Sequence, residues 1–207
     1  LESKKEIQKF GKLVQRMTGF VSELLVETDK KKFKKQLERI KKYEEITDKI
    51  ETEVVGYLAK VSESELSEEA SLQIRSMLSI ADDLETIGDI NYSMSRTIKR
   101  KNEDKIYFIP QQRENLLGLF KLVDQAMYKM QHNLEVEMNK VDLDGAYHAE
   151  KEINRFRNNL RKGHLKSIEN GEYQHASGMI YTDLFAALES IGDHVISISE
   201  ARAGKIS

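Results

Sequence analysis

The six residues Leu84–Asp89 (LETIGD) return 104 residues later as Leu188–Asp193 (LESIGD). Five of the six positions are identical, and the sixth exchanges a threonine for a serine. Two copies of such a string, half a chain length apart in 207 residues, indicate an internal duplication. We therefore expect a fold built from two equivalent halves.

Around both copies, apolar residues recur at steps of three and four, which is typical of amphipathic helices. Only one proline, Pro110, occurs in the chain, and we read it as part of a linker halfway along. The pattern predicts six helices, at about 2–27, 30–61, 68–100, 113–141, 144–170 and 174–202. The predicted fold is all-α, with two tandem antiparallel three-helix bundles at 1–104 and 105–207.

Composition excludes several functional classes. Lys and Arg total 33 against 35 for Asp and Glu, so the net charge of −2 gives no reason to expect nucleic-acid binding. The absence of cysteine excludes thiolate metal sites and cysteine nucleophiles. No apolar run reaches the roughly 18 residues of a membrane span. Because the chain begins at Leu1 with charged helical sequence, we expect it to be cut from a longer protein.

The duplicated string destabilises its own helix in two ways. It places Glu85 and Asp89, and again Glu189 and Asp193, four residues apart on one helix face, where like charges repel by a few tenths of a kcal/mol. It also puts a glycine inside each helix, at a cost of about 1 kcal/mol relative to alanine. A bound cation would offset the repulsion, and close packing of a neighbouring helix would explain the glycine. Both explanations remain open at this point.

The middle helix of each half carries an acidic residue on its apolar stripe. In the first half this residue is Glu44, with Asp48 four residues on. Alignment of the two halves at an offset of 106 places Glu150 and Asn154 at the equivalent positions. An unpaired charge on a buried stripe costs several kcal/mol, so it needs a cation, either a metal ion or a lysine or arginine.

An offset of 104 would instead place His148 and Glu152 opposite Glu44 and Asp48, but it matches the core residues less well. His194, beside Asp193, could add a nitrogen ligand. Oxygen ligands favour hard ions such as iron, manganese, magnesium or calcium. The predicted metal ligands are Glu44, Asp48, Glu85 and Asp89 in the first half, and Glu150, Asn154, Glu189 and Asp193 in the second.

These motifs resemble the PhoU family of phosphate-signalling proteins, whose chains are duplicated and all-helical with L-E-x-I-G-D once in each half. The resemblance implies a regulatory protein that is not an enzyme. It also implies multinuclear clusters of metal ions, iron or zinc, at the carboxylate pairs listed above. Asn154 stands where the family has an aspartate, which removes a ligand charge from the second site.

Other positions depart from free-standing members of the family. Thr86 and Ser190 replace the usual arginine, and no proline opens the third helix. Ala149–Asn154 and Gly163–Leu165 look more like the PhoU-like tail of bacterial sodium/phosphate cotransporters. This resemblance implies a cytoplasmic domain at the face of the cell membrane, with the transmembrane transporter domain of the same chain as its partner. Long amphipathic helices also leave a face that a homodimer could cover.

Three other interpretations compete with the transporter domain. The first is a free-standing PhoU-type regulator of a phosphate-importing ATPase and its sensor kinase. The second is a structural helical adaptor without metal. The third, a ferritin-type di-metal oxidase, requires Glu-x-x-His pairs, and the third residue after Glu85, Glu150 and Glu189 is glycine or isoleucine.

Overall fold

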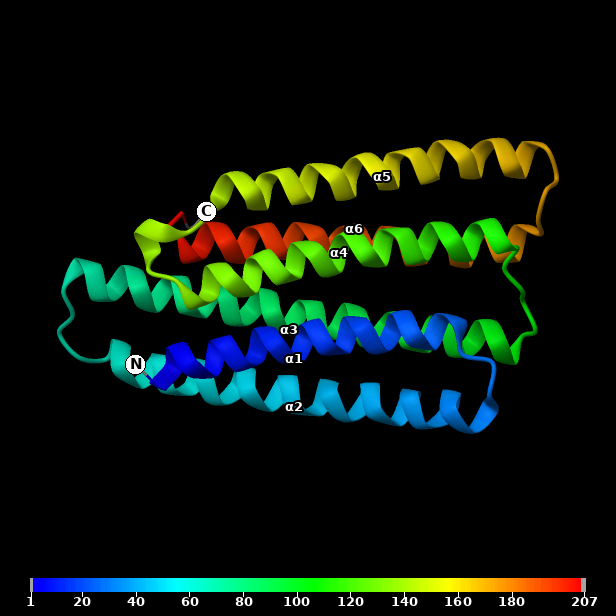
Figure 1. Ribbon diagram of the computed structural model, residues 1–207. Coiled ribbons are helices and arrows are strands. Elements are labelled where there is room, and N and C mark those ends of the chain that lie inside the picture. The colour runs from blue at the N-terminus through cyan, green and yellow to red at the C-terminus, as the bar shows by residue number, and fades with distance from the viewer. Residues whose placement is uncertain (1, 206–207) are drawn as a thin grey trace.

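The computed structural model describes residues 2–205 and confirms the all-helical prediction. Six long α-helices run side by side along one axis (Figure 1). Their bounds are α1 Glu2–Val26, α2 Lys30–Ser62, α3 Glu68–Glu103, α4 Pro110–Glu135, α5 Leu143–Glu169 and α6 His175–Arg202. A short 3-10 turn, η1, spans Met138–Lys140. Helices α1–α3 form the first bundle and α4–α6 the second, and the predicted boundary at 104–105 lies in the connection between α3 and α4.

Capping residues explain several helix ends. The side chain of Asp29 accepts a hydrogen bond from Lys32 N at the start of α2, and Ser67 accepts one from Ala70 N at the start of α3. Gly171, with φ of +66°, follows the end of α5 in the left-handed conformation that ends many helices. These three ends lie where the sequence places them.

The ends of α4 correct the sequence prediction. The helix begins at Pro110 rather than near residue 113, because proline suits the first helical position and the Gln112 side chain accepts the Ile109 N–H at 3.1 Å. It ends at Glu135 rather than at 141. The Asn133 side chain there accepts the Asp142 N–H at 2.9 Å, which holds the turn toward α5.

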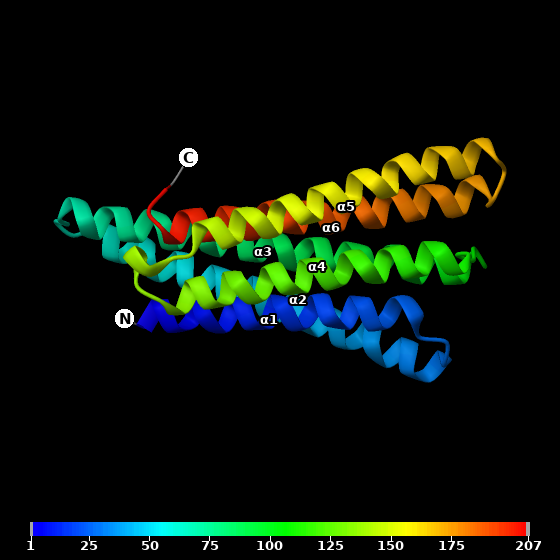
Figure 2. The same cartoon turned by 45° about the horizontal axis from the view of Figure 1, so that its top comes forward.

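The two bundles share one continuous hydrophobic core. Helix α3 packs on α6, and α1 packs on α4. Ser76 on α3 donates to Ala201 O on α6, and Gln15 on α1 donates to Asp124 on α4 at 3.2 Å. Figure 2 shows the same helices from a second direction, with α3 and α4 between the α1–α2 pair and the α5–α6 pair. Among the described helices, none is long and apolar enough to cross a membrane.

Candidate metal centre

The two glycines of the duplicated string sit where the middle helix of each bundle approaches the third. A Cβ added at Gly88 would lie 3.0 Å from Thr47 Oγ1, and one added at Gly192 would lie 3.1 Å from Ile153 Cδ1. Thr47 and Ile153 differ by 106 positions, so the contacts support the offset of 106 for the middle helices. Glu150 and Asn154 are therefore the structural equivalents of Glu44 and Asp48, and His148 and Glu152 are not.

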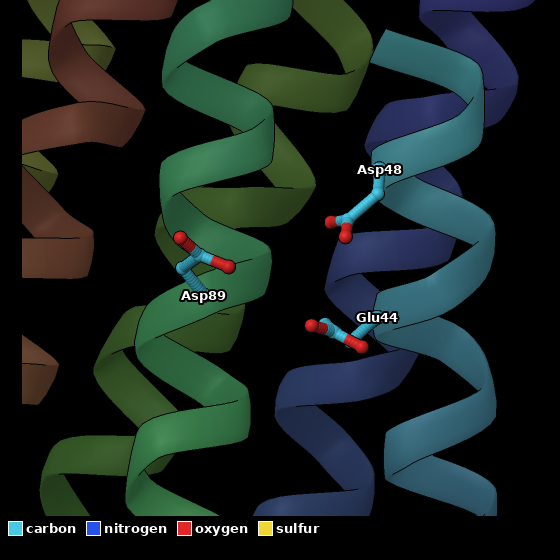
Figure 3. Close-up of side chains that lie close together, drawn as sticks. All are labelled: Glu44, Asp48 and Asp89. Carbon is cyan, nitrogen blue, oxygen red and sulfur yellow. The ribbon is translucent and has the colours of Figure 1, made fainter. Parts of the chain in front are cut away.

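The close approach brings acidic side chains from two helices together in the first bundle. Glu44 and Asp48 on α2 and Asp89 on α3 each offer an oxygen, and these oxygens lie within 4.8 Å of one another. Figure 3 shows the three carboxylates in the space between α2 and α3. Asp48 and Asp89 are exposed and Glu44 is half-buried, so the cluster is open to ions from solution. Within residues 2–205, no other set of three ligand-type side chains is this compact.

Burial and mutual repulsion both raise the pKa values of these carboxylates. Burial, followed by the charge of Asp48, raises the pKa of Glu44, and burial followed by Asp89 raises the pKa of Asp48. Burial, with the charge of Asp89 and a hydrogen bond to it, raises the pKa of Glu85 to about 7. A cation in the cluster would favour the ionised forms and remove this cost.

Glu51 adds a fifth acidic group that the sequence analysis missed. Its charge contributes to the raised pKa of Glu85, although it comes after Asp48 in size. Glu51 lies seven residues after Glu44, two helical turns along the same face of α2. This spacing could have revealed it. The first bundle therefore presents Glu44, Asp48, Glu51, Glu85 and Asp89 along the α2–α3 contact.

In the second bundle, an arginine of the chain itself balances the acidic charge at the equivalent contact. Arg157 on α5 forms an ion pair with Glu189 on α6, and both side chains are largely buried. Glu150 accepts a hydrogen bond from the Asn154 amide. The sequence analysis missed Arg157, although the offset of 106 places it opposite Glu51. Glu150, Asn154, Glu189 and Asp193 thus do not form a second compact acidic group.

Two neighbouring groups complete the second site. Burial and the charge of Glu189 raise the pKa of Asp193, while His194 and Arg157 lower it. His194, considered above as a nitrogen ligand, instead places Nδ1 2.7 Å from Asp83 Oδ1 on α3. Ser197 donates to the other oxygen of Asp83 at 2.7 Å. His194 therefore links the two bundles.

The chemistry of the donor set fits a hard divalent cation in the first bundle. Its three clustered donors are carboxylate oxygens, and Glu85 adjoins them. The site can hold an ion and tie α2 to α3.

The fold defines an all-helical protein of two duplicated three-helix bundles with carboxylates between the second and third helices. Residues 7–98, which make up most of the first bundle, match the model of the PhoU domain family. By sequence alone, no curated protein matches the chain.

Solved structures show that the whole chain has a PhoU-like fold. PhoU from Pseudomonas aeruginosa matches 97% of this chain and 93% of its own, with a TM-score of 0.82 and 17% identity. The phosphate transport system regulatory protein PhoU from Streptococcus pneumoniae matches 97% and 91%, with a TM-score of 0.77 and 17% identity. A PhoU-like phosphate regulatory protein from Shewanella oneidensis matches 97% of both chains, with a TM-score of 0.72 and 12% identity. The Streptococcus pneumoniae and Shewanella oneidensis proteins are named as phosphate regulatory proteins.

Proposed function

We propose that this chain is a PhoU-type regulatory protein that controls phosphate uptake. The observation that carries the proposal is the match over 97% of the chain to a phosphate transport system regulatory protein of the same fold. The PhoU domain match at 7–98 supports it independently. The protein acts by contact with a transport component at the cytoplasmic face of the cell membrane and performs no chemistry itself.

The comparisons favour the free-standing regulator over the transporter domain. The chain spans more than nine-tenths of each PhoU structure to which it is similar. In this role, the protein restrains a phosphate-importing ATPase and its sensor kinase. The transporter-domain alternative is supported by the sequence of Ala149–Asn154 and Gly163–Leu165, which resembles the tails of sodium/phosphate cotransporters.

The acidic cluster has a defined part in this function. We infer that a divalent cation held by Glu44, Asp48 and Asp89, with Glu85 beside them, ties α2 to α3 and fixes the shape of the first bundle. Iron or zinc are the ions that the family resemblance suggests. The positive centre formed on binding would change the surface that α2 and α3 present to a partner.

Phosphate uptake in a host that lacks its own PhoU-type regulator tests the proposal. Two strains are compared, one with only an ATP-driven phosphate importer and one with only a sodium-dependent cotransporter. The free-standing regulator lowers uptake of labelled phosphate in the first strain, and the transporter domain alters uptake only in the second. Unchanged uptake in both strains would contradict a regulatory role and favour the structural adaptor.

A matched pair of variants separates the role of the metal from that of the fold. Asp48→Asn with Asp89→Asn removes two ligand charges without removing volume, whereas Asn159→Asp with Asn158→Asp changes charge at exposed positions of α5. We expect only the first variant to lose metal and control of uptake. If the variant binds no metal and still controls phosphate uptake fully, the regulatory function does not depend on the acidic cluster.

A further inference from the structure

The α1–α2 turn and the α3–α4 connection lie at the same end of the molecule (Figure 1). A long open groove is lined by residues of the first bundle at this end. Its volume is about 1630 Å³. One wall is the start of α2, residues 30–41, and the other is the end of α3, residues 92–103. Twelve helical residues on each wall give a length of about 18 Å.

The groove is strongly basic although the whole chain is weakly acidic. Three glutamates line it, and two of these already lie near lysines of the rim, Glu38 near Lys34 and Glu103 near Lys99. The basic residues that line it are Lys30, Lys34, Lys41, Arg96, Lys99, Arg100, Lys101 and Arg113. These eight cations, from α2, α3 and α4, produce a positive field along the hollow.

The floor of the groove is apolar. Leu25 is buried there, and Phe33, Leu37 and Tyr92 are only half-buried although they pack against the core. At its edge, the side chain of Tyr107 is 77% exposed. The core stripe of α2 therefore lacks a complete cover at this end.

At the equivalent end of the second bundle, contacts within the chain close the groove between the two helices. Tyr147 on α5 donates a hydrogen bond to Glu200 on α6 and so joins the two walls. The α4–α5 connection also lies over this end, because Met138 Sδ would be only 3.4 Å from a Cβ at Gly204. The residues of the first bundle that correspond to Tyr147 and Glu200 are Lys41 and Arg96. Two cations cannot form this bridge.

We propose that this basic groove is the docking site for an amphipathic helix of a partner protein that carries acidic side chains. The acidic residues of such a helix would lie between the cations of the two walls. Its apolar residues would cover Phe33, Leu37 and Tyr92. A segment of about 12 residues matches the walls in length.

The shape of the groove selects this occupant over other anions. A phosphate ion is too small to cover the apolar floor or to span the cations of both walls. A lipid bilayer is flat, whereas the floor is recessed between two helices. An acidic helix satisfies both charge and shape, and its recognition depends on neither the metal cluster nor phosphate control.

The probe that tests the proposal is a phage-displayed library of 14-residue amphipathic helices, with the polar positions varied among Glu, Lys and Gln. Selection on the full chain should enrich Glu over Lys. The selected peptides should shift NMR resonances of residues 30–41 and 92–103, and their affinity should fall as salt is raised. Selection without enrichment of Glu would overturn the proposal.

Two variants localise the binding. Lys41→Tyr with Arg96→Glu copies the closed pair of the second bundle and should weaken the selected peptides by about tenfold or more. Lys41→Gln with Arg96→Gln should weaken them less and guards against a folding defect. The control, Lys162→Tyr with Arg161→Glu, changes charge equally on exposed α5 and should leave affinity unchanged. Equal binding by all variants would overturn the proposal, as would displacement of the peptide by millimolar inorganic phosphate or anionic vesicles.

Discussion

The α2–α3 contact of the first bundle and the α5–α6 contact of the second have equivalent backbones but carry different charged side chains. The first bundle has five carboxylates along the α2–α3 contact. Among residues 2–205, no lysine or arginine forms an ion pair with any of them. The second has Asn154 in place of Asp48 and Arg157 in place of Glu51, and Arg157 pairs with Glu189. A duplicated scaffold can thus balance acidic groups at this contact with an arginine of its own, while its other copy leaves them open to an ion from solution.

The largest expected effect distinguishes the bundles by metal. A metal ion at a concentration 100 times its Kd should stabilise the native chain by about 2.7 kcal/mol. Asp48→Asn with Asp89→Asn should abolish this gain, and Glu189→Gln with Asp193→Asn should not. Elemental analysis measures the metal bound by the native chain and by each variant, and thermal unfolding with and without chelator measures the stabilisation. A native chain that melts identically with and without added iron, zinc or manganese would refute the asymmetry.

Removal of Arg157 should destabilise the second bundle, whereas removal of the equivalent Glu51 should not destabilise the first. Arg157→Ala leaves Glu189, which is 20% exposed, without its partner and should cost about 2 kcal/mol of unfolding free energy. Glu51→Ala at the equivalent position of the first bundle should be neutral or slightly stabilising, since it removes a repelling charge. Urea unfolding of metal-free protein measures the difference. Equal costs at the two positions would mean that the charges do not explain the asymmetry.

The second site can be given the residues of the first. Asn154→Asp with Arg157→Glu recreates the acidic set, and we expect it to gain stabilisation by metal of about 1.4 kcal/mol at ten times the Kd of the new site. In the absence of metal, this variant should be less stable than the native chain. Metal titration followed by thermal unfolding tests it, and a variant that gains no metal would show that geometry as well as charge has diverged.

The acidic cluster should make metal-free stability depend on pH. The pKa of Glu85 in the folded state is about 7, above its ordinary value of 4.5, so the folded state binds this proton more tightly than the unfolded state. The stabilisation is complete below about pH 4.5 and is lost as the pH rises through 7. Because solvent partly screens Glu85, we expect a loss on the order of 1 kcal/mol. Glu85→Gln should remove this part of the pH slope in urea unfolding, and an unchanged slope would contradict the assignment.

The smallest effect comes from the amide that replaces an aspartate. Asp48→Asn should stabilise the metal-free first bundle by about 0.3 kcal/mol, because it removes the repulsion of Asp48 with Glu44 and Asp89. Asn154→Asp should destabilise the second bundle by a similar amount and also removes the hydrogen bond to Glu150. Thermal melts of the two single variants give the comparison. Shifts of the same sign would contradict it.

Much of the fold follows directly from the sequence. A chain with one proline and regular apolar stripes has few ways to fold other than as long helices, and the repeated string reveals the duplication. The clustering of Glu44, Asp48 and Asp89 also follows, because the offset and the helical period place them on facing surfaces. The role of Pro110 was missed because proline both breaks helices and begins them.

Contacts between distant elements were beyond the reach of sequence patterns. Arg157 lies on a face that also carries charged residues in the first bundle, so only a residue-by-residue comparison of the two middle helices could have marked it. The link from His194 and Ser197 to Asp83 joins α6 to α3 across more than 100 residues and has no periodic signature. Periodicity describes one helix at a time, and these contacts depend on which helices become neighbours.

The packing of α3 on α6 and of α1 on α4 pairs each helix with its own duplicate, in antiparallel directions. Such pairing of like with like is the arrangement of a twofold axis, as in a symmetric dimer. The ancestor of this protein, before its gene was doubled, is thereby expected to have been a single bundle that assembled as a pair. A single chain, unlike such a dimer, can place different residues at equivalent positions, as it does with Glu51 and Arg157.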